Sequence, residues 1–283
     1  LNIDEDHLDF YKDIHEIEDT FAKFLGQIVP GGMAVLCGDD VRALSMKQRI
    51  SVRSVTYGLD NPDCDYTAKD ITHDDAMCFS FTPVEHGVEL PRVTLRVPGR
   101  HNALNALGVT AAARELGLTG EEIARGLDAF AGAHRRFELT ATIEGVKLYH
   151  DYGHNPAEFH SVIPLADAVA GDHRLFVVCQ PHTYSRTKLL FDQYMTCFTG
   201  ADEVLITDIY AAREKDPGDI HATMLVDALQ KHGVPAVYTP DFDACENYLR
   251  THWQPGDVMI SLGCGNINLL NEQIARHEAE KTN

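Results

Sequence analysis

The chain has 283 residues, of which 44% are hydrophobic, and a formal net charge of −19 at pH 7. This length allows a substantial buried core and favours two domains, although one large domain is also compatible with it. The acidic balance argues against nonspecific binding to nucleic acid or to an anionic membrane surface, since both select clusters of Lys and Arg. No stretch reaches the roughly 18 to 20 apolar residues that cross a bilayer.

The N-terminal segment, LNIDEDHLDFY, places four acidic residues around His7. It is either a metal-binding loop or the solvated acidic end of a chain, and such ends usually bind nothing. The next segment, IHEIEDTFAKFLGQI, has helical spacing and is predicted to end near Pro30. MAVLC (33–37) predicts a short buried strand.

Between residues 51 and 98 the pattern is alternating and β-branched, which predicts a small set of strands, partly antiparallel. The period then becomes helical. HNALNALGVTAAARELG predicts one helix, and TGEEIARGLDAF predicts a second with Thr119 and Glu122 as a capping box. The segment AGAHRRFE (131–138) predicts a domain junction, and we place the boundary between residues 133 and 134.

From about residue 157 apolar strands alternate with amphipathic helices. The strands are RLFVVCQ, EVLITDIY, AVYT and VMISLGCG, and the helices are LLFDQYMTCF, HATMLVDALQKHG, DACENYLRTHW and INLLNEQIARHE. This alternation predicts an α/β fold in which residues 134–283 form a Rossmann-like domain with a mostly parallel sheet covered on both faces. Ligands of such sheets bind outside the carboxyl ends of the strands, so the loops there are the candidate site.

Four of these loops are rich in polar residues: HDYGHNP (150–156), QPHTYSRT (180–187), DIYAAREK (208–215) and LGCGN (262–266). In the second loop, His182 and Arg186 follow an apolar strand, and Arg suits a bidentate grip on a carboxylate or phosphate. In the first loop, Asp151 is a candidate for a ribose hydroxyl, Tyr152 for a ring and His154 for a charged substrate group. Each loop alone is equally a solvated loop with a structural histidine; two at one sheet edge favour a site.

Three further features bear on nucleotide binding. Asn102, near a helix start, is either a cap or a ligand-binding amide. Arg135 and Arg136 either meet nucleotide phosphates at the junction or are a solvated pair. The chain contains no G-x-x-x-x-G-K-[ST] motif, so it has no phosphate loop of its own.

The seven cysteines are scattered, without a C-x-x-C pair or the Cys/His spacing of a zinc site. Cys179 and Cys264 follow apolar runs and are predicted to be buried thiols in a reducing cytoplasm.

In this order, NIDEDHLDFY, VPGRHNALNAL, AHRRFE, HDYGHNPAEF, QPHTYSRT, DIYAAREK and LGCGNI closely resemble the Mur ligases. QPHTYSRT and DIYAAREK favour the branch of that family that adds L-alanine, and the resemblance covers essentially the whole chain. It implies that residues 1–133 are the C-terminal part of the central ATP-binding domain and that residues 134–283 bind the amino acid. The UDP-sugar domain and the phosphate loop would lie upstream of Leu1, so the chain would be inactive without that N-terminal partner segment.

The resemblance also implies a reaction. ATP phosphorylates the carboxylate of UDP-N-acetylmuramate, and the amine of L-alanine attacks the resulting acyl phosphate while Mg²⁺ neutralises phosphate oxygens. This reaction belongs to peptidoglycan precursor synthesis and implies a bacterial cytoplasm.

By resemblance, His7 is a magnesium ligand. Asn102 reads adenine, Arg136 and Asp151 contact the phosphate and ribose region, and Tyr152 lies by the base.

Also by resemblance, His154 and Arg186 are the catalytic residues that hold the L-alanine carboxylate, and His182 binds substrate beside them. Two positions depart from the family pattern: the usual His-His pair is His154-Asn155, and Thr183 stands where some members have Arg. The carboxylate therefore depends more on Arg186.

Two alternatives remain open. In the first, the chain is part of another Mur-type or folylpolyglutamate-type amide ligase. In the second, it is a non-catalytic module that binds an amino acid or a nucleotide.

Overall fold

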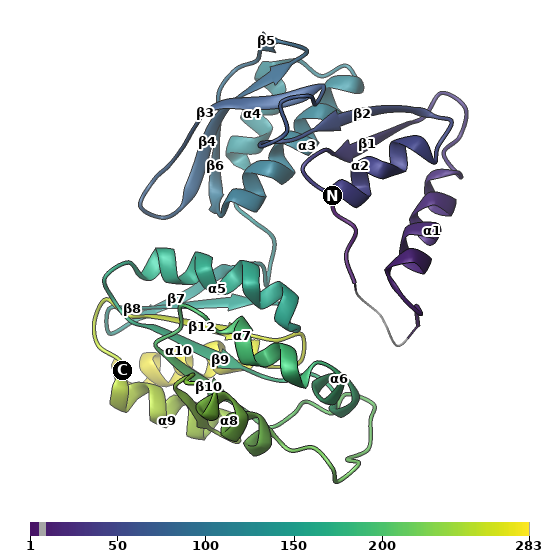
Figure 1. Ribbon diagram of the computed structural model, residues 1–283. Helices are drawn as coiled ribbons and strands as arrows, with labels where there is room; N and C mark the ends of the chain where they lie inside the picture. Colours follow the sequence, from purple (N-terminus) through teal and green to yellow (C-terminus); the bar gives the residue numbers. More distant parts are fainter. Residues whose placement is uncertain (6–9, 283) are drawn as a thin grey trace. The chain divides into compact units, whose positions relative to one another are not determined.

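The computed structural model describes residues 1–5 and 10–282, which form two compact units, Leu1–Ala131 and Gly132–Asn283 (Figure 1). His7, the predicted magnesium ligand, falls at 6–9 and so lies outside the described residues. Across the described ranges, no helix combines the length and the apolar character that crossing a membrane requires.

The first unit is built on a six-stranded mixed sheet in the order β1-β2-β3-β4-β5, with β6 also paired to β4. Strands β1 to β3 are parallel neighbours, whereas β4 is antiparallel to β3, β5 and β6, so the prediction of a partly antiparallel set is confirmed. The strands are β1 (Met33–Cys37), β2 (Arg53–Tyr57), β3 (Tyr66–His73), β4 (Cys78–Glu85), β5 (Val88–Glu89) and β6 (Val93–Pro98).

The helices of this unit are α1 (Ile14–Leu25), α2 (Val41–Ser45), the 3-10 turn η1 (Met46–Gln48), α3 (Arg100–Glu115) and α4 (Gly120–Ala129). The predicted end of the first helix near Pro30 is wrong, because Gly26 already terminates α1. The predicted capping box is confirmed: Thr119 accepts from the backbone of Glu122, whose carboxylate accepts from the Thr119 N–H.

The second unit contains a six-stranded sheet in the order β11-β10-β9-β12-β8-β7. All neighbours are parallel except β7 and β8, which confirms the prediction of a mostly parallel sheet. The strands are β7 (Glu138–Ile143), β8 (Val146–Asp151), β9 (Leu175–Cys179), β10 (Glu203–Ile206), β11 (Ala236–Tyr238) and β12 (Val258–Leu262).

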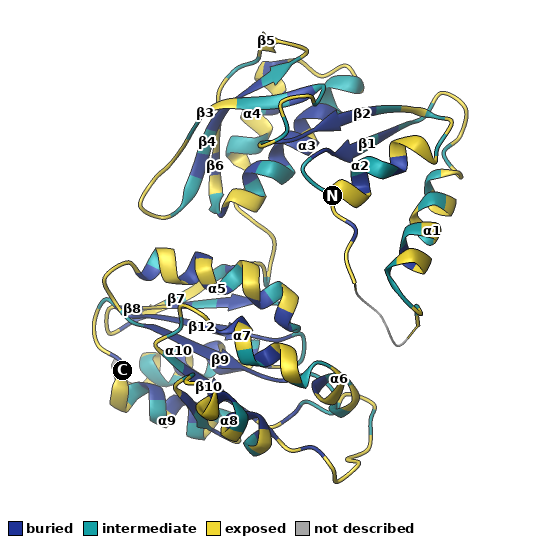
Figure 2. Ribbon diagram, viewed as in Figure 1, coloured by how far each residue is buried: buried dark blue, intermediate teal, exposed yellow. Residues whose placement is uncertain are grey.

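Helices cover both faces of this second sheet. One core cluster joins Leu249 of α9 and Ile274 of α10 to strand residues such as Phe176, whereas Phe159 of α5 packs against Phe198 next to α7. Figure 2 shows the strands between these layers as mostly buried. The helices are α5 (Pro156–Ala170), α6 (Tyr184–Leu189), the 3-10 turn η2 (Phe191–Gln193), α7 (Tyr194–Cys197), α8 (Ala222–Lys231), α9 (Phe242–His252) and α10 (Asn268–Thr282).

The single helix predicted over LLFDQYMTCF is wrong. The end of α6, the turn η2 and the short α7 share this segment, since the backbone leaves the α conformation at Leu190.

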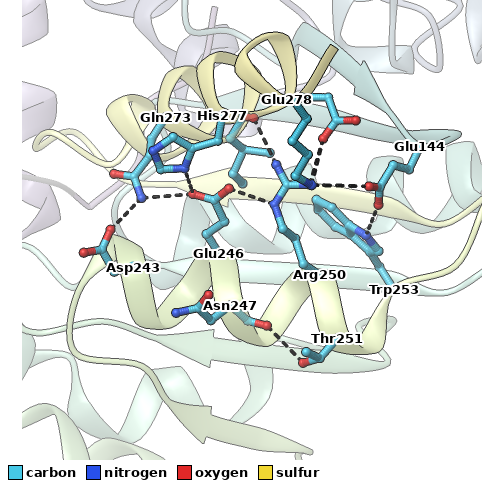
Figure 3. Close-up of polar contacts among 12 residues, drawn as sticks. Glu144, Asp243, Glu246, Asn247, Arg250, Thr251, Trp253, Gln273, His277 and Glu278 are labelled. Atoms are coloured by element: carbon cyan, nitrogen blue, oxygen red, sulfur yellow. Dashed lines mark hydrogen bonds and ion pairs between the residues drawn. The ribbon is translucent and has the colours of Figure 1, made fainter. Parts of the chain in front are cut away.

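A partly buried network of hydrogen bonds and ion pairs links α10 to α9 (Figure 3). Glu246, only 5% exposed, accepts hydrogen bonds from Arg250 Nε at 2.8 Å, Gln273 Nε2 at 3.0 Å and His277 Nδ1 at 2.8 Å. Arg250 also donates to Glu278 at 3.0 Å. These contacts place a charged cluster between two helices whose apolar faces lie on the sheet.

All seven cysteines are free thiols. Cys179 is buried, as predicted, but the same prediction is wrong for Cys264, which is partly exposed because it lies in the loop beyond the end of β12.

Candidate functional site

The four polar loops predicted from the sequence follow the carboxyl ends of β8, β9, β10 and β12. The strands that carry the two histidine-bearing loops, β8 and β9, are not neighbours, because β12 lies between them. The loops nevertheless converge, since the ring centroids of His154 and His182 are 5.9 Å apart. The change of strand order around β12 creates the crevice position at which α/β sheets bind ligands.

Asp151, at the end of β8, is only 5% exposed, and both of its carboxylate oxygens accept backbone hydrogen bonds. Oδ2 accepts from Phe137 N at 2.8 Å and Oδ1 from Gly153 N at 2.7 Å. Burial raises the pKa of Asp151, although these two bonds partly oppose it. In this arrangement Asp151 ties the junction at Phe137 to the loop that follows β8.

The two junction arginines differ in their contacts. Arg135 has a left-handed backbone, with φ at 61°, and its guanidinium donates to Gly263 O, Gly265 O and His150 Nε2. Both guanidinium groups lie over the ring of Tyr152, Arg135 at 4.8 Å and Arg136 at 5.6 Å from its centroid, but Arg136 forms no ion pair with any described residue. Arg135 therefore anchors loops, whereas Arg136 keeps its charge available.

His154 is held by its own loop. Its Nδ1 lies 3.1 Å from Tyr152 O, a geometry in which Nδ1–H donates and Nε2 remains the free ring nitrogen. The adjacent Asn155, a departure from the family pattern, is the N-cap of α5, because its side chain accepts from Glu158 N at 2.9 Å. Asn155 is thus used by the helix.

His182 and Arg186 lie on the loop after β9 and on α6. The His182 ring stacks on Tyr210 at 5.7 Å, and its Nδ1 is buried without a hydrogen-bond partner among the described residues. Burial, with Arg186 and His154 nearby, lowers the pKa of His182, so the imidazole is neutral at neutral pH. Arg186 is half-buried and pairs with no carboxylate in the described ranges. Together they offer a free cation beside two imidazoles.

The loop after β12 closes this edge of the sheet. Gln180 Nε2 donates to Asn266 Oδ1 at 2.9 Å, and a Cβ at Gly265 would lie 2.5 Å from Gln180 Oε1 and 2.8 Å from the Tyr210 ring. Only glycine fits there, so three loops meet at one point.

Asn102 belongs to the first unit. Its side chain donates to Pro98 O at 2.7 Å and does not cap α3, whose N-cap is Gly99. It lines a largely apolar cavity of about 520 Å³ between β6, α3 and α4, together with Asn105 and Glu122. A cavity with a few amides on an apolar lining suits a planar heterocycle.

No group of three or more His, Cys, Asp or Glu side chains in residues 1–5 and 10–282 is arranged to hold a metal ion.

Two family models match the chain. The Mur ligase middle domain matches residues 1–113, and the model described as Mur ligase, glutamate ligase domain matches residues 135–265. The chain belongs to the Mur ligase family.

Relatives of this Mur ligase chain include the UDP-N-acetylmuramate--L-alanine ligases of Acetivibrio thermocellus, 38% identical over 98% of the chain, and of Caldanaerobacter subterraneus, 39% identical over 96%. The chain spans 59% of the length of each. Among solved structures, the UDP-N-acetylmuramate-alanine ligase of Thermotoga maritima aligns with a TM-score of 0.76 at 22% identity, over 98% of this chain and 58% of that one. A MurF ligase of the same organism in complex with ADP aligns at 0.75 and 16% identity, over 100% and 62%. The two structures show the shared fold.

The sequence alone did not identify several residues of the candidate site in this Mur ligase chain. The resemblance gives Arg136 a role but none to Arg135, and the polar loop 208–215 contains no residue with a predicted role. Tyr210 and Glu214 of that loop contact the loop after β9, and only the structure brings these segments together.

Proposed function

We propose that this chain is the part of an L-alanine-adding Mur ligase that binds the nucleotide and the amino acid. In the complete reaction ATP supplies the phosphoryl group that activates the carboxylate of UDP-N-acetylmuramate, and the L-alanine amine displaces phosphate to form an amide. The names of the 38% and 39% identical relatives support this choice over other amide ligases and over a non-catalytic module.

The observation that carries the proposal is the unpaired Arg186 guanidinium between loops that also bring His154 and His182 together. A half-buried Arg without a carboxylate partner is a cation that can bind one singly charged anion. The carboxylate of a small amino acid satisfies it. The neutral imidazole of His182 is suited to take the proton that the ammonium group must lose before it attacks.

The nucleotide contacts are proposed on separate grounds. Arg136 presents a guanidinium for phosphate beside the ring of Tyr152, and Asp151 accepts from the backbone N–H groups of Phe137 and Gly153, each of which follows one of these two residues. Asn102, at the cavity of the first unit, reads adenine. Magnesium binding by His7 stays a prediction from the resemblance.

The proposal is tested with Arg186→Ala in the ligase that contains this chain. Loss of the charge-assisted bond raises the KM for L-alanine by one to two orders of magnitude, or roughly 1.5 to 3 kcal/mol. Lys188→Ala is the matched control, because this second cation on α6 is already paired with Asp219. Steady-state kinetics with L-alanine varied give both values.

An unchanged KM in the Arg186 variant would mean that the carboxylate is held elsewhere. A wild-type preference for a peptide or γ-glutamyl nucleophile over L-alanine would overturn the substrate assignment. We place the reaction in peptidoglycan precursor synthesis in the bacterial cytoplasm, where a nucleotide-linked sugar and ATP are both available.

A further inference from the structure

The backbone of Thr183 is in an unfavourable conformation at the centre of the candidate site. Its φ is 63° and its ψ is 146°, a combination that a β-branched residue rarely adopts. Thr183 lies directly after His182 and is the N-cap of α6, which carries Arg186. Such a conformation persists only where the surrounding contacts enforce it.

The enforcing contacts come from the loop after β10. Thr183 N donates to Tyr210 O at 2.8 Å, and Tyr210 N donates to Pro181 O at 2.8 Å, which forms a short parallel bridge between the two loops. The rings of His182 and Tyr210 stack across that bridge. The orientation of the His182 ring is therefore fixed by a segment nearly thirty residues further along the chain.

Glu214 adds a second contact between the two loops, at the residues that follow Thr183. Its carboxylate accepts from Ser185 N at 3.0 Å, from Ser185 Oγ and from the backbone N–H of Tyr184. Partial burial raises the pKa of Glu214, but these hydrogen bonds and His182 outweigh it, so the pKa is lowered and the group is ionised. An anion thus holds the first turn of α6.

Glu214 does not form an ion pair with the nearby Arg186. Its bonds go to Ser185 and Tyr184, whereas the guanidinium of Arg186, one residue further, pairs with no carboxylate in the described part of the chain. A carboxylate that neutralised Arg186 would compete with an incoming carboxylate. Glu214 instead fixes the helix start and leaves the cation free.

We infer that Glu214 is a positioning residue for the amino-acid carboxylate: it docks the first turn of α6 so that Arg186 and His182 are presented together. This inference rests on the proposed function, in which Arg186 receives L-alanine. It gives the loop 208–215 a role, through the first turn of α6.

The test compares three variants of the ligase that contains this chain. Glu214→Ala raises the KM for L-alanine about tenfold and leaves the KM for ATP within twofold. Glu214→Gln retains an acceptor oxygen and rescues part of the loss. Asp219→Asn is the matched control, since Asp219 pairs with Lys188 on the exposed side of the same helix and its loss changes neither constant.

A second measurement uses the 283-residue chain alone and needs no substrate. The neighbouring charged or titratable groups that shift the pKa of His182 are Arg186, His154 and Glu214. Removing the Glu214 carboxylate with Glu214→Gln lowers the NMR-titrated pKa of His182 still further, because Glu214 is the group that raises it. A loop that merely loosened would move that pKa upward toward its ordinary value.

The inference is overturned if Glu214→Ala leaves the KM for L-alanine unchanged, if the KM values for ATP and L-alanine rise in parallel, or if the His182 pKa rises or stays constant in Glu214→Gln. The Arg186→Ala variant separates this failure from failure of the proposed function. A large effect at Arg186 with none at Glu214 removes the positioning role alone.

Discussion

At the scale of single residues, His150 shows how the site is supported from beneath. It is 1% exposed, its Nδ1 lies 3.0 Å from Ser261 O and 2.9 Å from Ser261 Oγ, and its Nε2 accepts from Arg135 Nε at 3.0 Å. Burial and the Arg135 charge lower the pKa of His150 to about 4. The imidazole is thus kept neutral as an acceptor for the arginine that ties the loop after β12.

This lowered pKa predicts that the free energy of unfolding decreases at acid pH. The folded pKa is below the unfolded value of about 6.5, so the stabilisation is complete above pH 6.5 and is lost as the pH falls toward 4. It amounts to about 3 kcal/mol of the free energy of unfolding. Urea unfolding between pH 7 and pH 4 measures it. In His150→Gln, which cannot titrate, this share of the pH dependence disappears; parallel profiles for the two proteins would contradict the assignment.

At the scale of helices and strands, stability depends on the network between α9 and α10, where one substitution can leave a buried charge without its partner. Arg250 neutralises Glu246, a carboxylate that solvent hardly reaches. Sequence patterns predicted both helices and their apolar faces. They did not predict the network, because its charges lie on positions that amphipathic spacing assigns to solvent, and its contacts between side chains of the two helices join residues 27 or more positions apart.

Arg250→Ala should therefore lower the free energy of unfolding by about 3 kcal/mol, since it leaves a buried carboxylate without its cation. Lys281→Ala is the comparison, because Lys281 pairs with Glu278 at the surface and its loss changes stability by about 0.5 kcal/mol or less. Equal losses in urea unfolding of the two variants would show that Glu246 is not the group that matters.

At the scale of the whole molecule, each unit has its own sheet and its own hydrophobic core. In the second unit a six-stranded sheet has helices on both faces, which is a complete layered architecture. Its core residues, among them Phe176 and Met259, are all drawn from the same unit.

The fragment 132–283 should consequently fold without the first unit and unfold cooperatively in urea. The fragment 146–283 is a control, because it removes β7 and Arg135 and should lose the sharp transition. Far-UV circular dichroism and NMR amide dispersion measure both. A broad transition and poor dispersion in the longer fragment would show that its core depends on residues 1–131.

Much of the fold was predictable from local pattern. The apolar runs predicted β9, β10, β11 and β12 and the helices between several of them, because burial on both faces leaves a direct mark on sequence. The insertion of β12 between β8 and β9 was not predictable, since strand order leaves no local mark.

The candidate site was likewise only partly predictable from the sequence. Polar residues just after apolar strands identified the loops of His154, His182 and Arg186. The roles of Tyr210 and Glu214 depend on a left-handed backbone at Thr183 and on contacts between separate loops, which periodicity does not encode.

The two outer strands of the second sheet have a consequence for the protein in a crowded solution. β11 has only three residues, and β7 carries a register shift between Leu139 and Ala141. A short or irregular border offers another polypeptide few unpaired amides in regular succession, so these borders resist the strand-to-strand growth that leads to aggregation.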